Sequence, residues 1–321
     1  MTKFHTQGLA AMVFVASGMQ SLVAAESINP PTNPQSAPLT AREKKNLQFA
    51  LDFTREVLQA RHTELSPKYQ AEDYIQHNPN IPTGRAAFVA FFSRRPPVNP
   101  IPAKVDPAPV VMGAKGDFVW MIMEREDKDP RDPSKTYHFN TFDVYRMANG
   151  KIQEHWDSAQ RDPPPPGASA PPPVQQPARG EPGNTGKVSG TEKKNISIAT
   201  MELKDMLQYG HLELADKVMD PGYIQHNPNV PQGREGFKTF MSRVPGRTPE
   251  EIKPEWKAEP VLTLANGPYV LMMWDRKAKD PSDPSKEYTW DHFDVVRIEG
   301  GIVKEHWDEA RIAPPQPQGK Q

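Results

Sequence analysis

The sequence predicts an α+β protein of two similar domains, each a curved antiparallel sheet packed on N-terminal helices. The heptapeptide YIQHNPN occurs unchanged at residues 74–80 and 223–229. Each copy also ends in a glycine turn followed by EHWD, at residues 154–157 and 305–308. The copies are about 150 residues apart, which is the length of a domain and too long for a solenoid repeat. The chain is therefore a tandem duplication.

Helices are expected in the first half of each copy. Thr40–Glu43 and Ser189–Glu192 both have the Ser/Thr-x-x-Glu pattern of a capping box, which marks the start of a helix. Pro67 suits the first turn of a second helix, which the prolines of the repeated heptapeptide are expected to end. Gly84 and Gly233 are expected to open a third helix.

Strands are expected in the second half of each copy, where β-branched and aromatic residues are frequent. The Asp-Pro-rich segments at residues 129–135 and 280–286 have the composition of turns, and they are expected to join the first two strands. The expected strands are 118–124, 138–147 and 151–156 in the first copy and 269–274, 288–298 and 302–307 in the second.

Residues 1–25 have the pattern of a secretory signal peptide. Lys3 precedes an apolar run, and Val23 and Ala25 supply the small residues of a cleavage site. We therefore expect a periplasmic or secreted protein, and the apolar run is too short to span a membrane. The other expected segments are a disordered leader (26–39), domain 1 (40–161), a Pro-rich linker (162–190), domain 2 (191–313) and a disordered tail (314–321).

Composition excludes several classes of protein. The formal net charge is -1, so neither nucleic acid nor an anionic membrane is an expected partner. The absence of cysteine excludes disulfides, zinc–thiolate sites and thiol nucleophiles. The sequence also has no phosphate-binding loop, no GxSxG elbow and no dinucleotide fingerprint, so no cofactor is expected.

The order of motifs in both copies resembles the SnoaL-like branch of the NTF2-like superfamily. The resemblance rests on YIQHNPxxPxG, the aromatic helix after it, and the closing GKIQEHWD or GIVKEHWD. It implies cone-shaped domains with a pocket for a small molecule, packed here as a pseudo-dimer within one chain; further homo-oligomerisation stays open. Members include polyketide cyclases, so it also implies cofactor-independent acid–base chemistry of the aldol-cyclase or isomerase type on a small carbonyl compound.

The closing motif supplies the first candidate catalytic residues. Alternation along a strand places His155 and Asp157 on one face, and likewise His306 and Asp308. An imidazole beside a carboxylate is a useful acid–base pair, and the resemblance points to both aspartates as acid–base residues. Trp156, however, lies on the opposite face, which looks like the core side. Either a bulge turns the His–Asp pair inward, or the pair lies at a surface between domains.

Two further carboxylates are expected in the middle of a strand. Asp143 and Asp294 would be costly to bury without a partner. They are either catalytic carboxylates with a raised pKa in a pocket, or partners of an arginine such as Arg146 or Arg297.

Candidate substrate-binding residues come from two places. His77 and His226 lie where a helix is expected to break, and either a pocket role or a structural role fits them. The second copy has Asp291 and His292 where the first has Asn140–Thr141. This difference favours the second copy if only one is active, although it is equally consistent with drift.

Metal binding is not expected. His77, His155 and Asp157 have suitable side chains, but the sequence lacks the short spacings of HxH or HExxH. Two alternatives to an enzyme remain, namely a non-catalytic module that binds a small molecule and a structural pseudo-dimer without activity.

Overall fold

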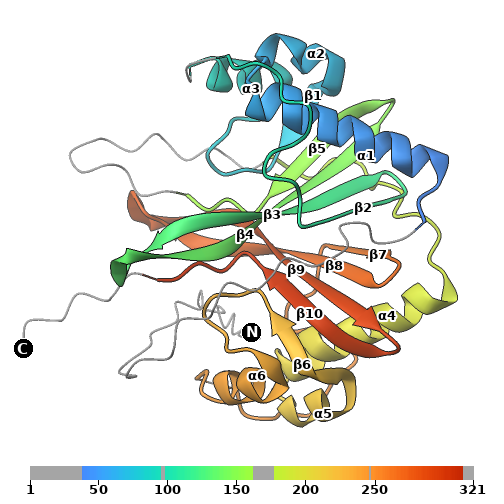
Figure 1. Ribbon diagram of the computed structural model, residues 1–321, viewed down its shortest axis with the longest axis vertical. Helices are drawn as coiled ribbons and strands as arrows, with labels where there is room; N and C mark the ends of the chain where they lie inside the picture. Colours follow the sequence, from blue (N-terminus) through green and yellow to red (C-terminus); the bar gives the residue numbers. More distant parts are fainter. Residues whose placement is uncertain (1–37, 95–97, 162–176, 246, 314–321) are drawn as a thin grey trace, which may run out of the picture.

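The computed structural model describes residues 38–94, 98–161, 177–245 and 247–313. Two domains of the same topology lie sheet against sheet, with their helices on the two outer sides (Figure 1). The expected signal peptide, nearly all of the leader, the whole of the tail and the first half of the linker lie outside the described residues. Within those residues, no helix has the length and apolar character needed to cross a bilayer.

Among the described residues, domain 1 contains four helical elements before its first strand, one more helix after it, and four further strands. Its elements are α1 (Ala41–Phe53), the π-helical η1 (Thr54–Gln59), the 3₁₀ turn η2 (Thr63–Leu65), α2 (Ser66–Tyr69), β1 (Gln70–Gln76), α3 (Arg85–Phe92), β2 (Val111–Lys115), β3 (Phe118–Asp129), β4 (Asp132–Ala148) and β5 (Lys151–Asp157).

Domain 2 repeats this order. Its elements are α4 (Gly190–Thr200), the π-helical η3 (Met201–Met206), the 3₁₀ turn η4 (Leu212–Leu214), α5 (Ala215–Val218), β6 (Met219–Gln225), α6 (Gly233–Met241), β7 (Leu262–Asn266), β8 (Tyr269–Asp280), β9 (Asp283–Glu299) and β10 (Ile302–Asp308).

The expected helix starts are confirmed. Thr40 caps α1 by accepting a hydrogen bond from the backbone N–H of Glu43, whose carboxylate in turn accepts from the backbone N–H of Thr40. Ser189 and Glu192 make the same capping box at α4. Each box satisfies donors that a helix N-terminus otherwise leaves unpaired.

Each sheet is mixed rather than wholly antiparallel, which corrects one expectation. The strand order is β1-β5-β4-β3-β2 in domain 1 and β6-β10-β9-β8-β7 in domain 2, with β1 and β6 parallel to their neighbours. The prolines of YIQHNPN therefore do not end a helix, because the chain is already extended from Gln70 and from Met219 onward. Strands β2 and β7 were not expected from the sequence.

The Asp-Pro-rich segments are mostly strand, which is a second correction. In domain 1 the turn is confined to the residues between Asp129 and Asp132, where the Asp129 carboxylate accepts the backbone N–H of Arg131. Strands β3 and β4 extend on both sides of it, so this hairpin projects beyond the body of the molecule (Figure 1).

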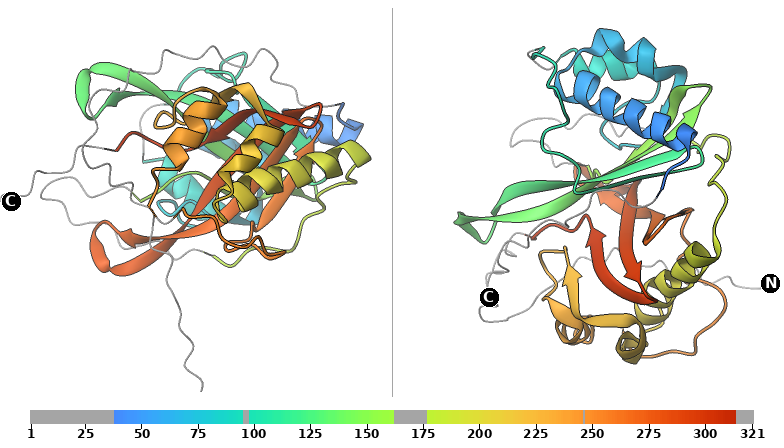
Figure 2. Two further views of the ribbon diagram at one scale, coloured as in Figure 1. Left: turned by 90° about the horizontal axis from the view of Figure 1, so that it is seen from below. Right: turned by 45° about the vertical axis from the view of Figure 1, so that its right-hand side comes forward.

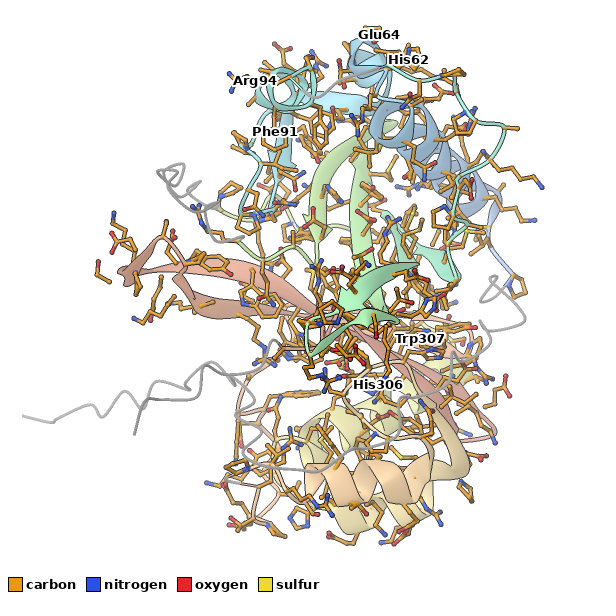
Figure 3. All side chains as sticks on the ribbon, turned by 60° about the vertical axis from the view of Figure 1, so that its left-hand side comes forward. His62, Glu64, Phe91, Arg94, His306 and Trp307 are labelled. Carbon is orange, nitrogen blue, oxygen red and sulfur yellow. The ribbon has the colours of Figure 1, made fainter. Side chains whose placement is uncertain are left out.

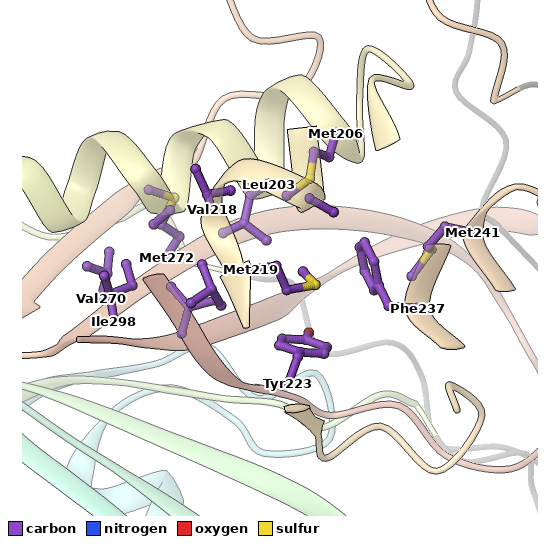
Figure 4. Close-up of a cluster of buried hydrophobic side chains, with 14 of the residues drawn as sticks. Leu203, Met206, Val218, Met219, Tyr223, Phe237, Met241, Val270, Met272 and Ile298 are labelled. Atoms are coloured by element: carbon purple, nitrogen blue, oxygen red, sulfur yellow. The ribbon is translucent and has the colours of Figure 1, made fainter. Parts of the chain in front are cut away.

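Each domain has its own core between helices and sheet. In domain 2 this core holds Leu203 and Met206 from the helical side, Tyr223 and Phe237, and Met272 from the sheet (Figure 4). The corresponding core of domain 1 contains Phe53, Tyr69, Phe88, Met121 and Tyr145.

A third apolar cluster joins the two sheets. It includes Trp120 and Trp156 of domain 1 and Tyr269 and Trp307 of domain 2, all buried. Phe142 and Phe293 stack across the interface, with ring centroids 5.4 Å apart and ring planes 1° from parallel. Figure 2 shows the two sheets crossing in the middle with helices outside. The chain therefore forms the expected pseudo-dimer.

The end of the expected linker is packed rather than free. Gly180 donates its backbone N–H to the carboxylate of Glu154 (2.9 Å), and the backbone carbonyl of Asn184 accepts from the backbone N–H of Asp117 (2.7 Å). Arg179 forms an ion pair with Asp275 of domain 2. Glycine permits this close approach, because it carries no Cβ to meet the strands.

Candidate functional site

A β-bulge decides which way the closing motif points. In the pairing of β4 with β5, Arg146 lies opposite Glu154 and Met147 lies opposite Ile152, so Gln153 is an extra residue. The pairing of β9 with β10 skips Lys304 in the same way. An extra residue reverses the alternation of faces along the strand.

The bulge turns the His–Asp pair toward the helices. Ile152 belongs to the helix–sheet core, whereas Trp156 belongs to the cluster between the sheets. His155 and Asp157 therefore share the inner side with Ile152, and the first of the two alternatives holds. In domain 2, Figure 3 shows Trp307 and His306 as neighbours on β10 at the centre of the molecule, remote from His62 and Glu64 at the outer end of domain 1.

In domain 1, hydrogen bonds define the tautomer of His155. The side-chain carbonyl of Gln76 accepts the backbone N–H of Asn78 (2.9 Å), which orients the amide nitrogen toward Nδ1 of His155 (3.1 Å). Nδ1 is then an acceptor, so Nε2 carries the proton and donates it to Oδ1 of Asp143 (2.9 Å). Tyr145 stacks on the same imidazole at 4.5 Å.

The two aspartates of this cluster lie directly opposite each other on β4 and β5. Asp157 is held by Nδ2 of Asn78 through both of its oxygens (2.8 and 3.0 Å) and by the backbone N–H of Ala159 (3.0 Å). Burial raises the pKa of Asp157, with a further contribution from Asp143 and an opposing one from His155. The side chain of Asp143 is 20% exposed, and one of its two oxygens accepts the hydrogen bond from His155.

Domain 2 keeps the same three residues and changes their surroundings. Asp294 and Asp308 lie opposite each other on β9 and β10, and His306 Nε2 is 2.8 Å from Oδ1 of Asp294. The other ring nitrogen, Nδ1, is 2.9 Å from Oε1 of Glu202 rather than from an amide. Glu202 occupies the position that Phe53 holds in domain 1, under the shift that superimposes YIQHNPN.

Domain 2 also adds a second histidine and a fourth carboxylate. His292 contacts Glu309 through Nδ1 and Oδ2 of Asp294 through Nε2 (3.1 Å). Burial opposes protonation of His292, but Glu309 and Asp294 outweigh it and raise its pKa to about 10. The same contacts overcome the effect of burial on Asp294 and hold its pKa well below the ordinary value. The first alternative for Asp294, a carboxylate with a raised pKa, is therefore wrong.

The second alternative, in which these aspartates pair with an arginine such as Arg146 or Arg297, is also wrong. Arg146 faces the other side of the sheet from Asp143, and its Nε (2.8 Å) and Nη2 (2.7 Å) both contact Oε2 of Glu154. Arg297 pairs with Glu305 in the same way. These pairs lie beside the interface between the domains.

The HNP histidines lie at this interface and not in the interior cluster. His77 contacts the carboxylate of Glu154 through Nε2 (2.8 Å), and His226 contacts Glu305 (3.0 Å). Asp291 also faces the other domain, buried near Arg179. Burial raises the pKa of Asp291 well above its ordinary value, which Arg179 partly offsets. Of the four expected substrate-binding residues, only His292 joins an interior cluster.

Three residues of the clusters were missed by sequence reasoning, namely Gln76, Glu202 and Glu309. Gln76 and Gln225 are identical in the repeat and gave no sign of a role. Glu202 was detectable, because it is a carboxylate on the apolar stripe of a helix where the other copy has Phe53. Glu309 directly follows the EHWD motif of the second copy, where the first copy has Ser158.

Comparison with known proteins agrees with this architecture. The family model described as a SnoaL-like domain matches residues 52–155 and 202–306, together more than half of the chain. The chain therefore belongs to the SnoaL-like family. No curated protein matches it in sequence.

Solved structures that resemble this chain each correspond to one part of it. A candidate polyketide cyclase from Bacillus cereus is 19% identical, with 36% of this chain and 72% of that chain covered and a TM-score of 0.26. An LEH-like epoxide hydrolase from M. tuberculosis is 16% identical (36% and 81% covered, TM-score 0.27). An NTF2-like protein of unknown function from Mesorhizobium loti is 13% identical (39% and 97% covered, TM-score 0.28).

Proposed function

We propose that the chain is an enzyme that transfers protons on a small carbonyl compound without a cofactor, in a reaction of the aldol-cyclase or isomerase type. The observation that carries the proposal is the cluster of Asp143, His155 and Asp157 on the inner face of domain 1. Membership of the SnoaL-like family supports the same class of chemistry.

Each residue of the cluster has a distinct role in this proposal. Asp143 is the general base, because one of its oxygens is held by His155 Nε2 and its side chain keeps a partly exposed surface. Removal of a proton next to a carbonyl gives an enolate, which can attack a second carbonyl or be reprotonated elsewhere. Asp157, whose pKa is raised by burial, exchanges a proton with the enolate oxygen.

Domain 1 is the better candidate for this reaction. Both oxygens of Asp294 are engaged by imidazoles, one by His306 and one by His292, whereas only one oxygen of Asp143 is engaged by His155. The sequence difference that favoured the second copy consisted of Asp291 and His292. Asp291 faces the interface between the domains. His292 binds the second oxygen of Asp294, which is the carboxylate that would act as the base.

The proposal is tested by exchange of α-protons for deuterium, which requires no knowledge of the complete reaction. A panel of small ketones and β-keto esters is incubated with the protein in D₂O, and loss of the α-proton signal is followed by NMR. Acid–base residues contribute about 10²–10⁴-fold to rate, so Asp143→Asn is expected to reduce the exchange rate by that factor. Asp127→Asn, at an exposed position of β3, is the matched control.

Two results would overturn the proposal. One is an exchange rate for the wild type that equals the rate in buffer for every compound. The other is an Asp143→Asn variant that folds with the wild-type thermal midpoint and exchanges at the wild-type rate. If a compound raises the midpoint without exchanging, the non-catalytic binding module replaces the enzyme as the better interpretation.

We propose further that the protein acts after export, in the periplasm or outside the cell. The support is the signal-peptide pattern of residues 1–25, which ends in Val23 and Ala25. Intact-mass measurement of the protein from the periplasm of an expression host tests this. The expected chain begins at Glu26, and an uncleaved chain retained in the cytoplasm would contradict it.

A further inference from the structure

The inner face of domain 2 gathers three side chains with the donor atoms of a metal site. One ligand atom each of Asp294, His306 and Asp308 lies within 4.8 Å of the others, and all three residues are buried. We propose that these residues bind a divalent transition-metal ion, with His306 Nε2 and one oxygen of each aspartate as ligands. The proposal is separate from the proton transfer assigned to domain 1.

Glu202 is an independent observation that supports the site. A metal-binding histidine commonly donates its other ring N–H to a carboxylate, which fixes the tautomer and orients the ring. Oε1 of Glu202 is 2.9 Å from Nδ1 of His306 and holds a proton there, so the proton between Nε2 and Oδ1 of Asp294 (2.8 Å) is the one that a metal ion would displace. Glu202 is fully buried, and its Oε2 has no hydrogen-bond partner in the part of the chain that the structure describes.

The two aspartate ligands are supported as well. His292 holds Oδ2 of Asp294, which leaves Oδ1 facing His306. Asp308 accepts hydrogen bonds from Asn227 Nδ2 (2.9 Å) and from the backbone N–H of Ala310 (2.8 Å). Such contacts fix the orientation of ligating carboxylates, whose oxygens keep a second lone pair for the metal.

Domain 1 provides an internal contrast. Its Gln76 directs an amide N–H at Nδ1 of His155, which forces the proton onto Nε2 and removes the lone pair that a metal needs. Where Glu202 stands in domain 2, domain 1 has Phe53. The duplication therefore offers the same Asp–His–Asp arrangement with an amide facing Nδ1 in domain 1 and a carboxylate facing Nδ1 in domain 2. Only in domain 2 can Nε2 give up its proton to a metal ion while Nδ1 keeps one.

The balance of charge points the same way. The cluster contains four carboxylates, from Glu202, Asp294, Asp308 and Glu309, and two imidazoles, from His292 and His306. Even with both imidazoles protonated, the carboxylates exceed the positive charges in a largely buried site, which is costly without a counter-ion. A divalent cation supplies that counter-charge.

The ligand types select the metal. Imidazole nitrogen suits Zn²⁺, Fe²⁺ and similar ions, whereas Mg²⁺ and Ca²⁺ prefer sites made of oxygen alone. The short sequence spacings of familiar zinc motifs are absent because the ligands meet through the pairing of β9 with β10. The sequence-based expectation that no metal binds rested on those spacings.

Titration of the full chain with metal tests the proposal. The protein is stripped with EDTA, dialysed and titrated with ZnCl₂ or MnCl₂ by calorimetry, and bound metal is counted by mass spectrometry. We expect one ion per chain, with MgCl₂ as the negative control. His306→Gln and Asp308→Asn are expected to abolish binding, whereas the matched domain 1 variants His155→Gln and Asp157→Asn are expected to retain it.

Glu202→Gln separates metal support from a merely structural role. Loss of a carboxylate behind a ligating histidine weakens affinity about 10–100-fold, so the dissociation constant should rise by that factor in protein that still unfolds cooperatively. The proposal is overturned if the wild type takes up no zinc or manganese. It is also overturned if folded His306→Gln protein binds as tightly as the wild type, or if the domain 1 variants lose binding equally.

Discussion

The imidazole of His77 lies flat against the indole of Trp156, with ring centroids 5.0 Å apart and ring planes 3° from parallel. His226 and Trp307 repeat this contact in domain 2 at 4.5 Å and 6°. The histidines come from the repeated HNP and the tryptophans from the repeated EHWD, so the two motifs meet at the interface. Within EHWD, the tryptophan therefore packs in the cluster between the domains and the glutamate holds the histidine that stacks on it, while histidine and aspartate build the interior clusters.

The first prediction concerns the tryptophan of this contact. Trp156 is 3% exposed and packs in the cluster between the sheets. Trp156→Ala leaves a cavity there and should lower the free energy of unfolding by about 3–5 kcal/mol. Urea unfolding followed by circular dichroism measures the change. Val98→Ala, at a side chain that is 59% exposed, should change it by less than about 0.5 kcal/mol. Equal effects would contradict the assigned role.

The second prediction concerns pH. Burial raises the pKa of Glu154, but hydrogen bonds from His77, Gly180 and Arg146 outweigh it and leave the pKa below its ordinary value. A carboxyl group whose pKa is lowered by folding stabilises the protein above its unfolded pKa of about 4.3. That stabilisation is lost as the pH falls through the folded pKa.

Glu154→Gln should therefore destabilise the protein most near neutral pH, by about 3–5 kcal/mol, because Arg146 is left buried without its partner. The difference from the wild type should shrink below about pH 4, where the carboxyl group begins to take up its proton. Urea midpoints from neutral pH down to about pH 3 measure it. A difference that stays constant over this range would show that the charge of Glu154 does not contribute.

The third prediction concerns Asp157, whose carboxylate accepts two contacts from the amide of Asn78. Asp157→Asn places a second amide against the first and should cost about 1–3 kcal/mol. Asn78→Asp combined with Asp157→Asn restores a carboxylate facing an amide, so the double variant should recover part of the loss. Thermal unfolding of the three variants and the wild type completes the cycle. A double variant that is as unstable as the sum of the singles would rule out the pairing.

Much of the fold could be predicted from the sequence because it depends on local signals. The capping boxes at Thr40 and Ser189 bring their own hydrogen-bond partners, and the repeat itself shows where each domain lies. The resemblance to the SnoaL-like family likewise rests on short local motifs that occur in both copies. Strand β1 was missed because its parallel partner, β5, is far away in the sequence. No local pattern encodes such a pairing.

The candidate site was harder to predict than the fold. Simple alternation places His155 and Trp156 on opposite faces, but it cannot say which face is inside after a bulge at Gln153. The surroundings of the cluster depend on residues from other elements, such as Glu202 on η3. The chemical difference between the domains is therefore visible only when helix and sheet are seen together.

The last prediction concerns the packed end of the linker. A Cβ at Gly180 would lie 2.5 Å from Nη2 of Arg146 and 2.7 Å from Oε2 of Glu154, closer than atoms in contact can approach. Gly180→Ala should therefore displace the ion pair and cost about 1–3 kcal/mol. Gly190→Ala is the matched control, because a methyl group on Gly190 at the start of α4 would meet no atom within 4 Å, and alanine favours a helix. Urea midpoints should fall for the first variant and hold or rise for the second. If both variants matched the wild type, residues 177–189 would be a free tether in solution, and the contacts of Gly180 would not stabilise the pseudo-dimer.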